Sequence, residues 1–158
     1  MDYYVDAKGL QALTLYLYDT YGPQDQRRKL FALLNEAAQS GTVLKMSPGE
    51  QLLDLLYIDD VTAGFVVAFE RLAAAEAAGH QRYALASGQP IRLKDLVRLY
   101  EEIRGVRVNV EWGGRPYRPR EVMIPWRTRV LLPGWRPAVD LARGVRLMEG
   151  IAGGEGAS

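Results

Sequence analysis

Residues 12–23 read Ala-Leu-Thr-Leu-Tyr-Leu-Tyr-Asp-Thr-Tyr-Gly-Pro, and this stretch decides the expected fold. Residues 12–18 form a short, almost continuous apolar run without the polar alternation of a half-exposed strand. Such a run is typical of a strand that is covered on both faces, as strands in parallel sheets are. Tyr21-Gly22-Pro23 predicts a turn that ends this strand.

The rest of the chain alternates predicted helices and strands, which indicates an α/β protein with a parallel sheet. Helices are expected from residue 25 or 26 to about 39, from 59 or 60 to about 78, over 93–103 and over about 139–150. Strands are expected at residues 42–46, 52–58, 82–86 and 106–110. The chain supplies only a few strands, so we expect an apolar sheet edge that needs a partner.

Two adjacent carboxylates mark the start of the second predicted helix. Asp59 or Asp60 is expected to cap it, with both charges near its positive end. The two residues are neighbours and cannot face one another across a substrate, so we do not interpret them as a catalytic pair. Asp54 is expected to tie down the backbone of a turn. The buried face of this helix is expected to carry Val61, Phe65, Ala68 and Leu72.

Composition describes an ordinary globular chain of 158 residues with a net charge of +1. We expect one domain over residues 1–150 and a flexible, frayed tail over residues 151–158. The absence of cysteine excludes disulfides and thiolate chemistry. No signal-peptide pattern or bilayer-length apolar run is visible, so a cytoplasmic location without membrane association is expected. The single histidine, His80, is expected to be solvated, and no metal site is predicted.

Two segments, residues 17–23 and 52–61, with Lys29-Leu30 between them, resemble the substrate-binding half of nucleotide-sugar epimerases and dehydratases. These enzymes form the extended short-chain dehydrogenase/reductase family. Residues 83–88 and 134–137 match its later motifs, and the resemblance covers residues 10–148. It implies the last parallel strands of a Rossmann-type sheet plus the small α/β substrate-binding lobe, in a truncated chain that lacks the N-terminal dinucleotide-binding half. The spellings of residues 19–23 and 49–55 look like the branch that acts on CDP-linked sugars.

The resemblance nominates substrate-binding residues at Asp19, Lys29, Leu30 and Ser87. Asp19 follows a strand at the end where open α/β sheets place ligands, although residues 19–23 are equally typical of a simple turn. Lys29-Leu30 matches a pair that contacts the nucleotide diphosphate, and a helix start suits anions. The alternative for this basic run is the solvated start of a helix. Ser87 is retained, whereas Ala84 replaces the Asn of the family strand and Leu53 a frequent phosphate-binding Arg.

A second basic cluster covers residues 115–121, where Arg118 fits loosely the Arg that grips the nucleotide phosphates in the family. The guanidinium group is suited to forked recognition of phosphate. An exposed basic loop is the simple alternative. The neighbouring aromatic residues Trp112, Tyr117 and Trp126 would suit single-stranded nucleic acid, but the balanced charge of the chain speaks against that partner.

Tyr4 and Lys8 spell the Tyr-x-x-x-Lys pattern of the family's catalytic pair. We do not expect them to be catalytic, because Gly9 follows Lys8 directly and a strand begins at once. In the family, that pair lies early in a long helix. The glycine-rich residues 150–156 follow no strand, so they are not a dinucleotide fingerprint. NAD(P) is therefore expected for the full-length family and not for this chain alone, and whether the chain is an enzyme stays open.

These observations favour a nucleotide-sugar-binding fragment or split subunit of an NAD-dependent epimerase or dehydratase that is not catalytic alone. Its partners would be a nucleotide diphosphate sugar and either a separate dinucleotide-binding subunit or a second copy. The alternative is a non-catalytic oligomerisation or interaction module that uses the exposed sheet edge. An intact small enzyme of new chemistry lacks a credible catalytic constellation.

Overall fold

The computed structural model describes residues 2–25, 27–74, 79–126, 130–148 and 150. These residues divide into two compact units, each of which is described by itself. The first unit comprises Met1–Tyr21, Asp54–Gly88 and Trp126–Asp140. The second unit comprises Gly22–Leu53, Gln89–Pro125 and Leu141–Ser158. The predicted flexible tail at residues 151–158 lies outside the described residues.

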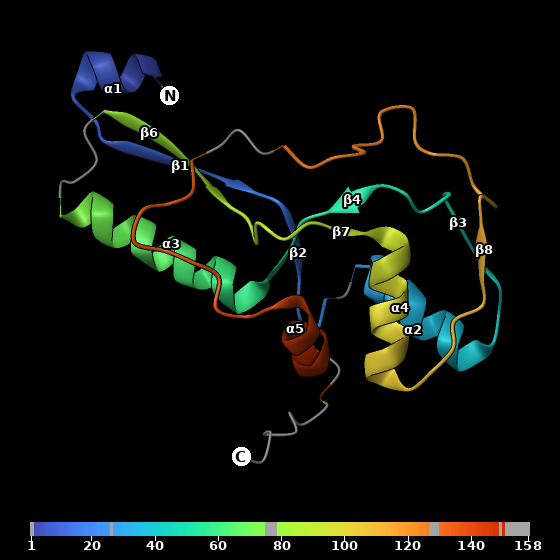
Figure 1. The fold of residues 1–158 in the computed structure, drawn as a ribbon. Coiled ribbons are helices and arrows are strands. Elements are labelled where there is room, and N and C mark those ends of the chain that lie inside the picture. The colour runs from blue at the N-terminus through green and yellow to red at the C-terminus, as the bar shows by residue number, and fades with distance from the viewer. Residues whose placement is uncertain (1, 26, 75–78, 127–129, 149, 151–158) are drawn as a thin grey trace. The chain divides into compact units, whose positions relative to one another are not determined.

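The first unit is built on parallel strand pairs, which confirms the expected sheet type. β1 (Ala12–Leu17) pairs in parallel with β6 (His80–Leu85), in register from Ala12↔His80 to Leu17↔Leu85. β2 (Asp19–Tyr21) pairs in parallel with β5 (Leu55–Tyr57). The short helix α1 (Asp2–Lys8) precedes β1, and the long helix α3 (Ile58–Ala73) connects β5 to β6. Figure 1 shows α3 running along the β1–β6 pair.

The core of the first unit lies between α3, the sheet and the segment that follows residue 130. Its buried members are Leu56, Val61, Ala68, Leu85, Leu132 and Trp135. The prediction that Phe65 lies on the buried face of α3 is wrong. Phe65 is half exposed, and Gly64 is buried instead. A Cβ atom on Gly64 would lie 2.5 Å from Leu85 Cδ1, so the close approach of α3 to β6 requires glycine there.

In its described residues, the second unit joins three helices with two short strand pairs. β3 (Leu44–Met46) pairs in parallel with β8 (Val110–Trp112), and β4 (Leu52–Leu53) pairs antiparallel with β7 (Ile91–Arg92). The helices are α2 (Leu30–Ser40), α4 (Leu93–Arg104) and α5 (Leu141–Met148). Gly41 and Gly105 end α2 and α4 in the left-handed conformation, which confirms both predicted helix stops.

Local hydrogen bonds explain where the element boundaries differ from the sequence predictions. α2 begins at Leu30 and not at residue 25 or 26, because the Asp25 carboxylate binds both the backbone N–H and the guanidinium of Arg27. The expected strand at 106–110 is displaced to Val110–Trp112. The Val108 N–H instead donates to Glu101 Oε1 at 2.8 Å, which holds this stretch against the end of α4.

Three further expectations are also corrected. Residues 19–21 form β2, so the predicted turn begins only after Tyr21. β1 is half exposed and not covered on both faces. α5 begins at Leu141 and not at residue 139, and the Val139 N–H before it donates to the Asp60 carboxylate. The predicted end of the helix near residue 78 lies outside the described residues.

Candidate functional site

Two of the nominated residues lie at the same edge of the first unit's sheet. β1 and β6 run in parallel and end together at the pair Leu17↔Leu85. Asp19 and Ser87 each follow that pair by two residues, so both lie just beyond the carboxyl ends of neighbouring strands. Ligands of open α/β sheets bind at this edge. Asp19 is exposed there as the first residue of β2.

Asp54 holds the backbone at this edge. The carboxylate is buried, and it accepts hydrogen bonds from the Ser87 N–H at 2.7 Å and the Gly88 N–H at 3.1 Å. The prediction that Asp54 ties down a turn is therefore confirmed. This turn carries Ser87, and the sequence did not indicate that Asp54 would reach it.

Asp60 is also buried, and here the prediction of a helix cap is wrong. Tyr57 occupies the N-cap position of α3 without a side-chain cap, and Asp59 and Asp60 lie within the first turn. The Asp60 carboxylate accepts the N–H groups of Ala138 (2.9 Å) and Val139 (3.0 Å). Its backbone carbonyl accepts the indole N–H of Trp135 at 3.0 Å. Asp60 thus fastens residues 135–139 to the start of α3.

Tyr21, from the Tyr-Gly-Pro segment, is buried in the first unit and packs edge-on against Tyr57, with 5.5 Å between ring centroids. Burial raises the pKa of its phenol above the usual range, and the negative charge of Asp140 adds to this effect.

In the second unit, Lys29 lies immediately before α2. Its backbone is extended, the first N–H groups of the helix have no side-chain cap, and Leu30 is the first helical residue. The preceding cations are engaged: Arg27 pairs with Asp25 at 2.7 Å, and Arg28 pairs with Glu36 at 2.6 Å. Arg27 holds the pKa of the Asp25 carboxyl down at about 2. The exposed Lys29 ammonium has no ion pair within the described residues.

Arg118 lies in an irregular loop that is fixed at three points of the second unit. The Arg115 N–H donates to the Met46 carbonyl at 3.1 Å, and the Leu52 N–H donates to the Met123 carbonyl at 2.9 Å. Between these points, the Glu50 N–H donates to the Tyr117 hydroxyl at 3.2 Å. The backbone of Arg118 closes a turn with Glu121, and its exposed guanidinium has no partner within the described part of the chain.

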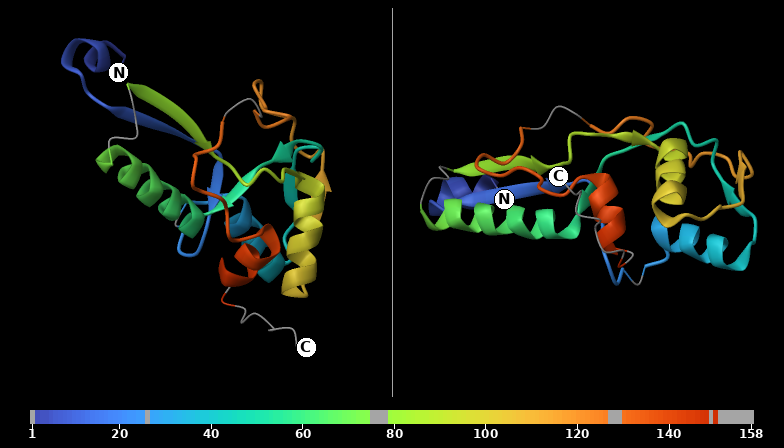
Figure 2. Two further views of the ribbon diagram at one scale, coloured as in Figure 1. Left: turned by 60° about the vertical axis from the view of Figure 1, so that its left-hand side comes forward. Right: turned by 60° about the horizontal axis from the view of Figure 1, so that its bottom comes forward.

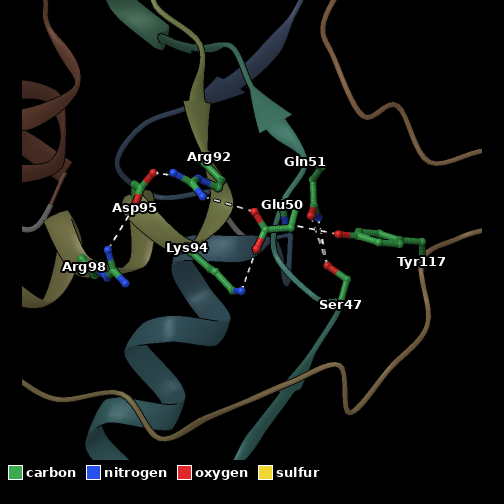
Figure 3. A network of polar contacts seen from close by, with 8 residues as sticks. All are labelled: Ser47, Glu50, Gln51, Arg92, Lys94, Asp95, Arg98 and Tyr117. Atoms are coloured by element: carbon green, nitrogen blue, oxygen red, sulfur yellow. Dashed lines mark hydrogen bonds and ion pairs between the residues drawn. The ribbon is translucent and has the colours of Figure 1, made fainter.

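A charge network beside this loop was missed by the sequence reasoning. Glu50 accepts from Lys94 at 2.7 Å and from Arg92 at 3.2 Å (Figure 3). Asp95 binds Arg92 at 3.0 Å and Arg98 at 3.3 Å. The bond from Lys94, followed by the one from Arg92, lowers the pKa of the Glu50 carboxyl. The i,i+3 spacing of Arg92, Asp95 and Arg98 predicts the ion pairs among these three residues. It does not predict that Glu50 joins them.

His80 is not solvated, contrary to prediction. Its side chain lies within the first unit, where Nε2 is 2.8 Å from Thr14 Oγ1 and Nδ1 is 2.5 Å from Asp2 Oδ1. Arg82 donates to both carboxylate oxygens of Asp2. The bond with His80, followed by the one with Arg82, lowers the pKa of Asp2. This arrangement fastens α1 to the sheet.

Tyr4 and Lys8 lie one helical turn apart on α1. The Tyr4 side chain is 56% exposed and contacts the ring of Tyr3 edge-on. Lys8 is the exposed last residue of this seven-residue helix. Their i,i+4 spacing puts the two residues on one face of α1.

Two strand-to-helix connections of the chain do not fit a dinucleotide pyrophosphate. β5 passes directly into α3, and β7 passes directly into α4, without an intervening glycine-rich turn. Such a turn allows backbone N–H groups to approach the pyrophosphate in this class of fold. The glycine-rich stretch after Gly150 lies outside the described residues.

The fold, with parallel strand pairs and polar residues beyond their carboxyl ends, is Rossmann-type. The model of the NAD dependent epimerase/dehydratase family matches residues 1–84, which is more than half of the chain, and the chain belongs to this family. The family resemblance inferred from the motifs is thereby confirmed. No helix among the described residues has the length and apolar character needed to cross a membrane.

Two curated relatives carry the same name. CDP-abequose synthase of Yersinia pseudotuberculosis is 33% identical over 127 residues, which cover 79% of this chain and 42% of the relative. CDP-abequose synthase of Salmonella typhimurium is 26% identical over 148 residues, which cover 90% of this chain and 49% of the relative. The chain thus spans about half the length of the curated relatives it matches.

Solved structures show the same fold. UDP-glucose 4-epimerase of Thermotoga maritima with UDP-glucose matches with a TM-score of 0.77 at 21% identity, over 95% of this chain and 48% of that one. UDP-glucose-4-epimerase of Stenotrophomonas maltophila, with bound NAD and formylated UDP-arabinopyranose, matches with a TM-score of 0.73 at 18% identity. That match covers 92% of this chain and 49% of the other.

Proposed function

We propose that this chain is the nucleotide-sugar-binding part of an NAD-dependent epimerase or dehydratase and does not catalyse a reaction alone. Membership of the family supports this proposal. The names of its curated relatives favour a CDP-linked sugar, and the solved neighbours include complexes with UDP-linked sugars. The proposed ligand class is therefore a nucleoside diphosphate sugar, with the CDP-linked form preferred.

The observation that carries the proposal is the state of Lys29. It is the cation of the basic run that forms no ion pair within the described residues, although its charge acts on the nearby Asp25 carboxyl, and it lies next to uncapped N–H groups at the start of α2. A phosphate group complements both the free ammonium charge and the exposed N–H groups. We assign Lys29 and Leu30 to the diphosphate on this basis.

Arg118 is the second proposed phosphate ligand. The backbone bonds of Arg115 and Met123 to residues 46 and 52 hold the ends of its loop, while the guanidinium extends into solvent. A held backbone limits the entropy that this loop would lose when it binds a ligand. The guanidinium can then bind phosphate oxygens through two parallel bonds.

Asp19 and Ser87 are proposed to contact the sugar. The support is their place just beyond the carboxyl ends of β1 and β6. Asp54 contributes by holding the Ser87–Gly88 backbone and not by touching the ligand.

The absence of independent catalysis is proposed on two grounds. The Tyr4 side chain is 56% exposed, and β5 and β7 pass directly into α3 and α4 without a glycine-rich turn. NAD(P), which the solved relative from Stenotrophomonas maltophila binds as NAD, would be held by the family's other half.

Calorimetric titration of the purified chain with CDP-glucose, UDP-glucose and NAD⁺ tests this function. We expect saturable binding of a nucleotide sugar and no binding of NAD⁺. Lys29→Ala and Arg118→Ala should each weaken that binding by about 1–3 kcal/mol, because each substitution removes a charged hydrogen bond.

Lys45→Ala and Arg107→Ala are matched controls, since both side chains are exposed and lie 3.7 Å from their carboxylate partners. Neither control should change the affinity. If the Lys29→Ala and Arg118→Ala variants bound the nucleotide sugar as tightly as the unsubstituted chain, the proposed phosphate site would be refuted. Binding of NAD⁺ would contradict the assignment of the cofactor to the family's other half.

A second candidate function is a non-catalytic interaction module. It is favoured by β1, which pairs with β6 and with no other strand among the described residues. Under this alternative, the chain associates stably through its sheet and binds no nucleotide sugar. The same titration separates the two functions.

A further inference from the structure

Two carboxylates neutralise most of the basic run at residues 27–29, which precedes α2. Asp25 binds the Arg27 guanidinium through both oxygens, to Nε at 2.7 Å and to Nη2 at 2.8 Å. Glu36, from within α2, accepts a hydrogen bond from Arg28 at 2.6 Å. Three cations thus lie beside two carboxylates, and one net positive charge remains, which corresponds to Lys29.

The Asp25 carboxylate also lies within electrostatic reach of Lys29. The hydrogen bonds from Arg27, and then the charges of Arg27 and Lys29, hold the pKa of the Asp25 carboxyl at about 2. This group is therefore ionised at neutral pH. A phosphate group bound at Lys29 would lie close enough to Asp25 to be affected by its negative charge.

Asp25 is tied to the backbone of the run as well as to a side chain. Its Oδ1 accepts the Arg27 backbone N–H at 3.1 Å, and the Lys29 N–H donates to the Arg27 carbonyl at 2.7 Å. A carboxylate that binds a backbone N–H two residues ahead forms a local turn of its own. The position of Asp25 is therefore set by the chain and does not depend on a bound ligand.

The start of α2 is anchored on α4 within the second unit. Phe31 is buried, and its ring centroid lies 6.1 Å from that of Tyr100 of α4. Arg104 of α4 donates to Asn35 of α2 at 3.3 Å. The two helices lie side by side in both views of Figure 2. A ligand at the start of α2 would therefore meet a backbone that is already ordered.

Free nucleoside diphosphates differ in charge from their sugar esters. In a nucleoside diphosphate sugar, each of the two phosphate groups has one acidic proton and carries one negative charge. The terminal phosphate of a free nucleoside diphosphate has a second acidic proton, with a pKa of about 6. At neutral pH the free nucleotide therefore carries nearly one more negative charge than the sugar ester.

We infer, on the basis of the proposed function, that Asp25, assisted by Glu36, makes the phosphate site select a nucleoside diphosphate sugar over the free nucleoside diphosphate. Lys29 can bind a phosphate group, whereas Arg27 and Arg28 are already paired. The additional charge of the free nucleotide finds no further unpaired cation within residues 27–29, which the structure describes, and both carboxylates repel it. Repulsion of the wrong ligand is a general route to specificity.

Calorimetric titration with CDP-glucose and with CDP at low ionic strength tests this selectivity. Asp25→Asn removes the charge and keeps an oxygen that can accept the Arg27 N–H. It should lower the Kd for CDP about threefold to tenfold more than the Kd for CDP-glucose, as expected for one nearby surface charge. Glu36→Gln should act in the same direction. Glu111→Gln, which removes a half-exposed carboxylate of β8, is the matched control and should leave the ratio of the two Kd values unchanged.

The charge of the ligand gives an independent measurement. At about pH 5, below the second pKa of about 6, CDP carries nearly the same charge as CDP-glucose. Asp25 remains ionised at that pH, because the pKa of its carboxyl is about 2. The effect of Asp25→Asn on the ratio of the two Kd values should therefore be present at about pH 7.5 and lost at about pH 5. It should also be lost in about 1 M salt, where the Debye length is about 3 Å.

An unchanged ratio in Asp25→Asn would overturn the inference, and so would a change in the ratio that persists at about pH 5 or in about 1 M salt. An equal loss of affinity for both ligands would also overturn it, because Asp25 would then act on the backbone and not through its charge. If the unsubstituted chain bound neither CDP-glucose nor CDP, the proposed phosphate site would fail, and this inference with it. The two kinds of failure are therefore distinguishable.

Discussion

The Asp54 carboxylate accepts the backbone N–H of Ser87 at 2.7 Å, across 33 positions of sequence. The carboxylate is buried, and it also accepts a second bond from the Gly88 N–H. It connects the residue before β5 to the turn after β6, so it sets the backbone at the carboxyl edge of the sheet.

Replacing Asp54 by Asn should therefore destabilise the first unit. The amide group of Asn cannot accept both N–H bonds, because its nitrogen would face one of the two donors. We expect a loss of about 1–3 kcal/mol in the free energy of unfolding, measured by urea denaturation. Asp19→Asn, at an exposed carboxylate nearby, is the control and should leave this energy unchanged. Equal stability of both variants would show that the Asp54 bonds contribute little.

Asp60→Asn should also lower the free energy of unfolding, because the side chain would lose one of its two acceptors for Ala138 and Val139. The expected cost is about 1–3 kcal/mol. The fluorescence of Trp135, whose indole binds the Asp60 carbonyl, reports whether residues 135–139 have loosened. Asp59→Asn is the matched control at the exposed neighbouring position. If Asp59→Asn lowered the free energy of unfolding as much as Asp60→Asn does, the effect would come from the loss of a negative charge near the N-terminus of α3 and not from the lost hydrogen bonds.

Gly64→Ala should destabilise the chain although alanine favours helices. The new methyl group would lie 2.5 Å and 2.8 Å from the two methyl groups of Leu85, which is fully buried. Overpacking of this kind costs about 1–3 kcal/mol, against a gain of up to about 1 kcal/mol in helix propensity.

A double-mutant cycle with Leu85→Ala checks this origin. Removal of the Leu85 methyl groups makes room for the methyl group that the Gly64→Ala substitution adds, so that substitution should cost less in the Leu85→Ala background. Additive losses in thermal unfolding would refute the steric explanation.

The Glu50 network should give the second unit an acid-sensitive contribution to stability. The pKa of the folded Glu50 carboxyl is lowered below its ordinary value of 4.5, chiefly by Lys94. A lowered pKa stabilises the folded chain above pH 4.5, and this contribution is lost as the pH falls through the folded value. When the free energy of unfolding is measured at a series of pH values, it should fall less steeply below pH 4.5 for Glu50→Gln than for the unsubstituted chain. Glu111→Gln, at a looser pair with Lys45, is the control and should follow the parent profile.

Much of the fold was readable because its signals are local. The apolar run at residues 12–18 predicted β1, and the glycines at 41 and 105 predicted the ends of α2 and α4. These features depend on a few consecutive residues, whose φ, ψ and side-chain preferences act over one or two turns. The same range of action explains the errors at Asp25 and Val108, where a nearby side chain captured a backbone donor.

The candidate site was readable only in part. Motif order nominated Asp19, Lys29, Leu30, Ser87 and Arg118, and their roles stay predictions. Nothing in the sequence showed that Asp54 would reach Ser87, or that Glu50 would join Arg92 and Lys94. These partners are 33 to 44 positions apart in sequence.

The sequence by itself determined the α/β class, the family and the approximate place of most elements. Tertiary structure alone decided that Asp60 points inward to residues 135–139, that Gly64 and not Phe65 faces β6, and that His80 binds Asp2. The physical reason is that each of these arrangements joins groups distant along the chain. A buried carboxylate must find its hydrogen-bond donors, and a closely packed helix must fit the strand opposite, wherever the folded backbone places them.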